Sequence, residues 1–192
     1  PQEQGLEAAR RAVARALQAR GYATIPIELE TTTPDVAEAQ MLSVLNSAPG
    51  VGLFNFIGHG GTNQLADEAL LLNEPGSENV SQLTNGAKLP VFLGFTCAVG
   101  DGSYPGYDSL AESLLWRQGG GAVASFVPTA LMLNGHSHML NLSLIDTLVG
   151  SNARPSLGEA ATAALRDFAA KGGPRYMLET YSVVGDPAHE EH

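Results

Sequence analysis

The sequence predicts an α/β fold: a three-layer sandwich in which a mostly parallel central sheet carries helices on both faces. Three apolar runs support this prediction, at residues 51–57, 90–95 and 121–127. None of them alternates cleanly between apolar and polar residues, and continuous apolarity over such a length is typical of a central strand covered on both faces. Helical patterns separate or follow these runs, which favours a sandwich with helices on both sides of the sheet.

The N-terminal part of the chain predicts two helices and one short strand. Residues 5–20 carry apolar side chains at helical spacing with arginines between them, and Gly21 is a plausible stop. Residues 22–29 are rich in β-forming residues, but Pro26 has no backbone N–H, so this run is expected to be an edge strand. A second helix is expected over residues 35–46.

Two later helices are marked by a capping box, in which a serine and a glutamate three residues further on bind each other's backbone N–H groups. The pairs are Ser109 with Glu112 and Ser156 with Glu159. A last extended run covers residues 177–184. No repeat, linker or internal boundary interrupts this pattern, so one domain is expected.

Composition narrows the classes of function. Ten basic against twenty acidic residues give a net charge of −10, which argues against nucleic acid or an anionic membrane surface as the main partner. No run approaches the roughly 20 apolar residues that span a bilayer, and the first residues lack the apolar stretch of a signal peptide. Cys97 is the only cysteine, which excludes a disulfide scaffold. We therefore expect a globular protein that does not insert into a membrane.

Two of the predicted strands end in residues with useful chemistry. The run 51–57 leads into Gly58-His59-Gly60-Gly61, and the run 90–95 leads into Thr96-Cys97. Neighbouring parallel strands would bring His59 and Cys97 to one edge of the sheet. An imidazole there can activate the thiol as a nucleophile and later protonate a leaving amine. The alternative is that Cys97 is an inert apolar residue and His59 a polar turn residue.

Other catalytic motifs are absent or incomplete. The Gly-x-Ser-x-Gly pentapeptide of many serine hydrolases does not occur. His136 and His138 could lie on one face of an extended segment, but neither an HExxH motif nor a second group of ligands accompanies them. The glycines of residues 100–106 match neither a Walker loop nor a dinucleotide fingerprint. A turn is the simplest interpretation of Gly185-Asp186-Pro187.

Four segments in a fixed order resemble the gingipain-like cysteine peptidases, members of the clan that also contains caspases and legumains. They are FNFIGHGG (54–61), LPVFLGFTCAVGDG (89–102), SLAESLLWRQGGGAVA (109–124) and YSVVGDPA (181–188). The resemblance covers most of the chain. It implies that residues 1–192 form a single caspase-like peptidase domain.

The resemblance also implies the role of each site residue. Cys97 would attack the scissile carbonyl to form a thioester, and His59 would protonate the departing amine and help to activate the water that releases the acyl group. The backbone N–H groups of Gly60 and Cys97 would bind the oxyanion. The wall of the substrate pocket would come from residues 128–138, with the candidates Thr129, Leu133, Asn134 and His136.

The sequence departs from the family in two ways. The family's catalytic unit usually has more sheet before the matched segments, so the chain is expected to be the C-terminal part of a longer unit. Its partners would then be protein or peptide substrates and an N-terminal fragment of the same precursor. Gingipains specific for basic residues place tryptophan or acidic groups along the pocket wall, whereas Trp116 lies in the preceding predicted helix. The pocket is therefore equally compatible with a neutral or small side chain.

No cofactor is required, because thiolate and imidazole supply both the nucleophile and the proton transfer. A structural calcium ion is common in this family, but no run of ligands in the sequence argues for one. The resemblance implies an extracellular, cell-surface or periplasmic location. The alternative function is a catalytically inactive caspase-like scaffold, or a binding module of a larger surface protein.

Overall fold

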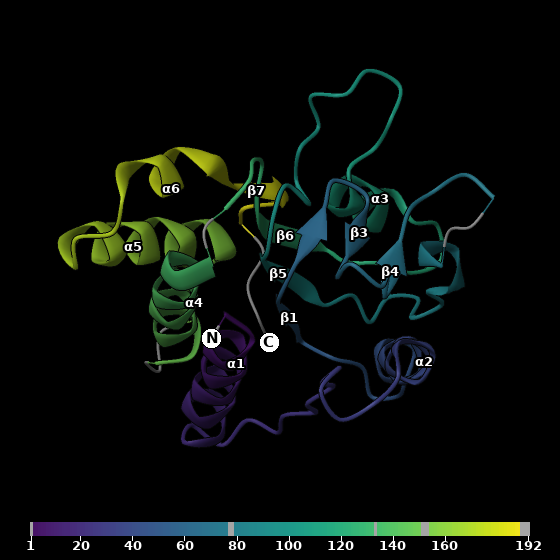
Figure 1. The fold of residues 1–192 in the computed structure, drawn as a ribbon, viewed down its shortest axis with the longest axis horizontal. Helices are drawn as coiled ribbons and strands as arrows, with labels where there is room; N and C mark the ends of the chain where they lie inside the picture. Colours follow the sequence, from purple (N-terminus) through teal and green to yellow (C-terminus); the bar gives the residue numbers. More distant parts are fainter. Residues whose placement is uncertain (1, 77–78, 133, 151–153, 189–192) are drawn as a thin grey trace.

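A four-stranded sheet forms the centre of the molecule within residues 2–76, 79–132, 134–150 and 154–188, which the structure, a computed structural model, describes. The strands lie in the order β1-β5-β6-β7 (Figure 1). β1 (Leu53–Ile57), β5 (Val91–Phe95) and β6 (Ala124–Pro128) are parallel. β7 (Tyr181–Gly185) pairs antiparallel with β6. The predicted mostly parallel sheet is therefore confirmed.

Helices lie on both faces of this sheet, as predicted (Figure 1). One face is covered by α1 (Gln2–Gln18), α4 (Asn134–Val149), α5 (Leu157–Ala170) and α6 (Arg175–Thr180). The other face is covered by α2 (Pro34–Leu45), α3 (Leu110–Trp116), the short 3₁₀ helix η1 (Val80–Gln82) and a small antiparallel sheet. The strands of that sheet are β2 (Gly60–Gly61), β3 (Gln64–Leu65) and β4 (Leu71–Leu72).

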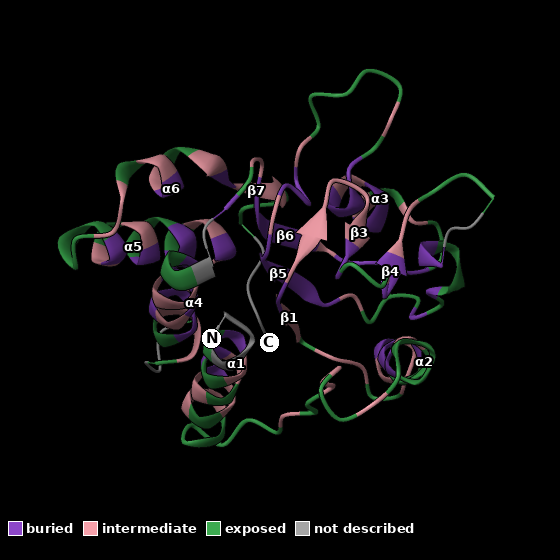
Figure 2. Cartoon of the chain, viewed as in Figure 1, coloured by how far each residue is buried: buried purple, intermediate pink, exposed green. Residues whose placement is uncertain are grey.

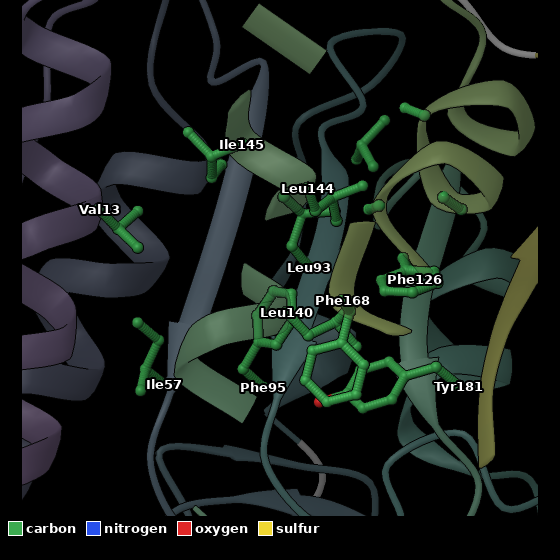
Figure 3. Close-up of a cluster of buried hydrophobic side chains, with 14 of the residues drawn as sticks. Val13, Ile57, Leu93, Phe95, Phe126, Leu140, Leu144, Ile145, Phe168 and Tyr181 are labelled. Carbon is green, nitrogen blue, oxygen red and sulfur yellow. The ribbon is translucent and has the colours of Figure 1, made fainter. Parts of the chain in front are cut away.

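Successive residues of the central strands pack into opposite layers. On β5, Leu93 and Phe95 belong to the core beneath α1, α4 and α5, which Figure 3 shows, whereas Phe92 belongs to the core beneath α2 and α3. Every residue of β5 and β6 is buried (Figure 2). Because both faces are covered, both sets of side chains must be apolar, which explains why these runs do not alternate.

The predicted starts of two helices are confirmed in detail. Ser109 accepts a hydrogen bond from the backbone N–H of Glu112, and the carboxylate of Glu112 accepts one from the backbone N–H of Ser109. Ser156 and Glu159 make the same reciprocal pair at the start of α5. Each box satisfies two N–H groups that a helix leaves free at its first turn.

Two of the predicted extended runs differ from the structure: the strand over residues 22–29 is wrong, and the run over residues 177–184 is wrong in its first half. Residues 22–29 are described and belong to no strand, because no described strand pairs with them and Pro26 removes one donor. Within 177–184, only the second half is extended. Its first half lies in α6, which begins after Pro174 and is supported by an ion pair between Arg175 and Glu179 at 2.8 Å.

Two features were not predicted from the sequence. Helix α4 mixes histidine, serine and asparagine with leucines all around its circumference, so it carries no clear amphipathic pattern. Strands β2, β3 and β4 have two residues each, which is too short for any periodicity to appear. Among the described residues, no helix is both long and apolar enough to cross a membrane.

Candidate active site

His59 follows β1 and Cys97 follows β5, and the two residues leave the sheet at equivalent positions of the paired strands. The ladder of β1 and β5 ends with Ile57 opposite Phe95, and the N–H of Gly58 extends it by donating to the Phe95 carbonyl oxygen at 3.4 Å. Paired residues differ by 38 in number, and so do His59 and Cys97. His59 and Cys97 therefore each lie two positions beyond the last pair of residues, and they follow neighbouring strands that run about 4.8 Å apart.

Both residues also follow strand positions that face the same layer. Ile57 and Phe95 belong to the core beneath α1, α4 and α5, and side chains two positions apart along a strand share a face. Cys97 is half-buried and packs against this core. His59 is half-buried and lines a cavity on the α1 side together with Leu6. The sequence expectation that one sheet edge receives both residues agrees with this register.

Met132 fixes the position of the Cys97 sulfur. The N–H of Met132 donates to Sγ of Cys97 at 3.4 Å, and the thiol donates to the Met132 carbonyl oxygen at 3.6 Å. Directly after the cysteine, Ala98 has a φ of 50°, in the left-handed region, and its N–H donates to the Ala130 carbonyl at 3.0 Å. The chain thus turns sharply directly after the cysteine, and Cys97 as a whole is half-buried.

Gly60 lets the loop after β1 lie against the loop after β5. A Cβ atom at Gly60 would clash with Oγ1 of Thr96 and lie 3.0 Å from the Gln64 carbonyl oxygen. The carbonyl of His59 accepts the N–H of Ala66 at 2.8 Å. The next pair of this antiparallel ladder, Gly60 with Leu65, is then of the non-hydrogen-bonded type, so the Gly60 N–H points away from β3.

A cavity of about 350 Å³ lies beside His59. Residues 27–30, residues 55–59 and Arg10 of α1 are among those that line it. The Arg10 guanidinium pairs with Glu30 and donates to the Ile57 carbonyl oxygen at 3.5 Å. Further acidic side chains in the lining are Glu28, Asp67 and Glu68. The cavity is therefore acidic around one arginine.

The predicted pocket wall is only partly described. Thr129 is half-buried, and both its N–H and its hydroxyl donate to the Thr180 carbonyl oxygen, at 2.8 and 2.9 Å. His136 is exposed on the first turn of α4. Leu133 lies outside the described residues. Asn134 is the first residue of α4, and only its backbone is described.

Met132 and Tyr181 lie in the same core as the cysteine, and the sequence gives no sign of it. No motif marks Met132. Tyr181 begins β7, and a tyrosine at the start of a strand carries no signal of its contacts. Burial is the main cause of the raised pKa of Tyr181; the Ser137 hydroxyl lowers this pKa, and Cys97 and Tyr176 raise it further.

His138, the second histidine of α4, lies half-buried two residues after His136. Burial lowers its pKa from the ordinary value of 6.5. Among the described residues, no group of three or more histidine, cysteine, aspartate or glutamate side chains is arranged to hold a metal ion.

Solved structures of gingipains share this fold. The Arg-specific cysteine proteinase gingipain R (RgpB) matches with a TM-score of 0.77 and 22% sequence identity, over 96% of this chain and 42% of that chain. The complex of Porphyromonas gingivalis RgpB pro- and mature domains matches with a TM-score of 0.76 and 23% identity, over 94% of this chain and 42% of that one. A structure described only as a protease gives 0.65 and 18%, over 78% of this chain and 37% of that one. These matches confirm the caspase-like α/β fold.

This chain spans less than half the length of each of those proteins. No curated protein sequence matches it at a significant level. The sequence profile of Peptidase family C25, the gingipain family, matches residues 7–190, which is nearly the whole chain. The chain therefore belongs to Peptidase family C25, and the resemblance noted from four of its segments is confirmed.

Proposed function

We propose that the chain carries the catalytic dyad of a cysteine endopeptidase, with Cys97 as the nucleophile and His59 as the general acid and base. The observation that carries this proposal is the register of β1 and β5, in which both residues follow the last pair by two positions. Membership in a family of cysteine peptidases supports it. Cys97 is only half-buried and is followed directly by a sharp turn at Ala98, which suits a nucleophile better than an inert core residue.

The proposed reaction has two stages. His59 takes the thiol proton, the Cys97 thiolate attacks the scissile carbonyl carbon, and the C–N bond then breaks as His59 gives the proton to the departing amine. This leaves a thioester. His59 next takes a proton from water, the resulting hydroxide attacks the thioester, and the C–S bond breaks to return the thiolate. No cofactor takes part in these steps. We propose no structural calcium ion, since the sequence contains no run of residues that would ligate one.

The backbone N–H groups of Gly60 and Cys97 are the proposed oxyanion donors. The Gly60 N–H supports this role because it points away from β3 and is free of that ladder. Donors of this kind act most strongly when they are fixed before the charge develops. The close contact between Gly60 and Thr96 holds the two donors on adjoining loops.

Thr129, Leu133, Asn134 and His136 are the proposed pocket residues. The Thr129 hydroxyl already donates to Thr180, so we assign this residue to the shape of the wall rather than to recognition of a charge. His136 is exposed and free to contact a substrate. No acidic residue stands among the four, which supports a pocket for a neutral or small side chain over one for arginine or lysine.

The proposed partner, besides protein or peptide substrates, is an N-terminal fragment of the same precursor. β1 lies at the edge of the sheet, and four of its five residues are only half-buried, whereas β5 and β6 are fully buried. Gly52 and Gly58 bond to β5, so the backbone groups of Leu53, Asn55 and Ile57 face the other side. There, Arg10 already donates to the Ile57 carbonyl. We propose that an extended segment of the fragment pairs with these three residues. Residues 1–192 would then be the C-terminal part of a longer catalytic domain.

Hydrogen exchange tests this partner. The amides of Leu53, Asn55 and Ile57 are expected to exchange quickly in the isolated chain and slowly in the protein purified from its source. The amides of Phe54 and Phe56 face β5 and serve as internal controls that stay slow in both. A native protein consisting of one polypeptide that begins at Pro1, with no companion chain, would refute the proposal.

A location outside the cytoplasm, whether extracellular, cell-surface or periplasmic, is proposed from family membership. Fractionation of the source cells, followed by detection of the chain with an antibody, tests this.

Alkylation tests the dyad directly. An activated Cys97 is expected to react with iodoacetamide at neutral pH much faster than free cysteine does, and to lose that advantage in His59→Ala. His136→Ala removes an exposed histidine of the proposed pocket wall that is not part of the dyad, and it serves as the matched control because iodoacetamide does not need that pocket. If Cys97 reacts no faster than free cysteine in the complete native protein, the inactive scaffold or binding module is the correct function.

A further inference from the structure

An exposed leucine lies beside the proposed nucleophile. Leu131 follows β6 by three residues and is 80% exposed, more than any other large hydrophobic side chain among the described residues. A single exposed leucine is ordinary on a protein surface, so its exposure alone assigns no role. The position of Leu131 is informative because its backbone is held against the segment of Cys97.

Both chain neighbours of Leu131 are bound to that segment. The Ala130 carbonyl oxygen accepts the N–H of Ala98 at 3.0 Å, and the N–H of Met132 donates to Sγ of Cys97 at 3.4 Å. Because the Cα of Leu131 is only about 2.4 Å from the nitrogen of Met132, it lies within about 6 Å of the sulfur. The Met132 side chain is buried in the core beneath α1, α4 and α5. Leu131 is therefore held on a fixed support next to Cys97.

The chain on either side of Leu131 is free of permanent charge. Residues 118–145 contain no aspartate, glutamate, lysine or arginine. Residues 98–100, which bind the backbone of the same loop, are uncharged as well. An aliphatic side chain in such surroundings offers a favourable contact to an apolar group and no partner to an ion.

The order of the strands indicates which half of a substrate meets Leu131. β5 leads to Cys97 and lies between β1 and β6 (Figure 1). In the proposed reaction His59, which follows β1, protonates the departing amine, so the amine half of the substrate lies on the β1 side. The acyl half then extends from Cys97 toward the β6 side, where Leu131 lies. The edge of β1 that we assign to the N-terminal fragment is separated from this loop by β5.

We propose that Leu131 is a specificity-determining residue, which packs against an apolar side chain of the substrate on the acyl side of the scissile bond. This rests on the proposed function and narrows its substrate class from neutral side chains to apolar ones, such as leucine, valine or phenylalanine. Contact between Leu131 and such a side chain removes apolar surface of both from water. A charged side chain at the same place loses hydration and gains no partner.

Cleavage of peptides that vary at the positions before the cut, by the complete native protein, tests this inference. The wild type is expected to prefer apolar side chains at one of these positions. Leu131→Ala is expected to lower kcat/KM for the preferred peptides about tenfold, and to leave unchanged the kcat/KM of peptides with a polar residue there. Leu131→Glu is expected to reverse the preference in favour of lysine at that position.

Trp116→Ala is the matched control. Trp116 is also a large exposed hydrophobic residue, 67% exposed, but it is the last residue of α3 and precedes β6. It is expected to leave both the preference and kcat/KM unchanged. The same preference in the wild type, Leu131→Ala and Leu131→Glu would overturn the proposal, as would an equal loss of the preference in Trp116→Ala. A lower melting temperature in Leu131→Ala with an unchanged preference would also overturn it, because the N-terminal fragment would then cover the leucine.

Alkylation separates failure of this inference from failure of the proposed function. Iodoacetamide is too small to need the Leu131 side chain, so Cys97 should react at the wild-type rate in Leu131→Ala and Leu131→Glu. Fast alkylation together with an unchanged preference would overturn only this inference. Slow alkylation in Leu131→Ala alone would show that the leucine supports the loop instead of binding substrate, and would also overturn the inference. Slow alkylation of the wild type would overturn the proposed function itself.

Discussion

Gly60 illustrates how single atoms determine the geometry of this site. It has no side chain where a Cβ would meet Thr96, and this allows the loop after β1 to lie against the loop that carries Cys97. Ala98 contributes on the other loop, because its left-handed conformation turns the chain sharply directly after the cysteine. The positions of His59 and Cys97 thus depend on their small neighbours as much as on the two residues themselves.

Replacement of either member of the dyad is expected to stop the reaction without unfolding the protein. Cys97→Ala removes the nucleophile and should abolish peptide hydrolysis. His59→Ala should reduce kcat by roughly 10²–10⁴, the usual contribution of general acid–base steps. Hydrolysis of a peptide library by the complete native protein measures both, with circular dichroism to check the fold. Full activity in Cys97→Ala would show that another residue is the nucleophile.

Gly60→Ala is expected to impair the site through its loops alone. The added methyl group must displace Thr96 or the Gln64 carbonyl, which separates the two strand ends. Gly61→Ala is the matched control, because a Cβ there meets only Cγ of Gln64, at 3.9 Å. We expect Gly60→Ala to lose most of the fast alkylation of Cys97, and Gly61→Ala to retain it. Equal rates in the two variants would contradict this account.

At the scale of elements, the helices and strands that could be predicted from the sequence are those with a strong local pattern. The capping boxes predicted where α3 and α5 begin, and the continuous apolar runs predicted the three parallel strands. Helix α4 could not be predicted in this way, since its polar residues serve the interior of the protein rather than a solvent-facing stripe. For the same reason, the sequence pointed to His59 and Cys97 but gave no sign of Met132 or Tyr181, whose positions depend on how distant elements pack.

Helix α4 is expected to make the stability of the protein sensitive to acid. Because burial lowers the pKa of His138 below its ordinary value of 6.5, the unfolded chain binds a proton more readily than the folded one. This contribution to stability is therefore complete above about pH 6.5 and is lost as the pH falls. The decrease in melting temperature between about pH 7.5 and pH 5.5 should be smaller in His138→Gln. His136→Gln, at an exposed position, should behave like the wild type. An unchanged decrease in His138→Gln would refute this prediction.

At the scale of the whole molecule, one sheet serves two cores. Leu93 and Phe92 are neighbours on β5, both fully buried, and they point into opposite layers. A substitution that disrupts packing on either face of the sheet therefore also disturbs β5, the strand that leads to the cysteine. We expect the two layers to unfold together rather than as separate units.

Leu93→Ala and Phe92→Ala test this coupling. Loss of a buried side chain of this size costs about 2–5 kcal/mol of unfolding free energy. Hydrogen exchange of α5 reports on one layer and that of α3 on the other. Both variants should accelerate exchange in both helices to a similar degree. Selective loss of protection in α3 with Phe92→Ala would show that the layers unfold independently.

The antiparallel position of β7 has a consequence for biosynthesis. His59 and Cys97 leave the ribosome well before residues 181–185, and β7 can add to β6 only once that final stretch has emerged. Until then the face of Phe126 that receives Tyr181 stays uncovered. A nascent chain would therefore hold the proposed catalytic pair in an unfinished setting, and we expect the proposed peptide cleavage to begin only after residues 181–185 have been translated and have paired with β6.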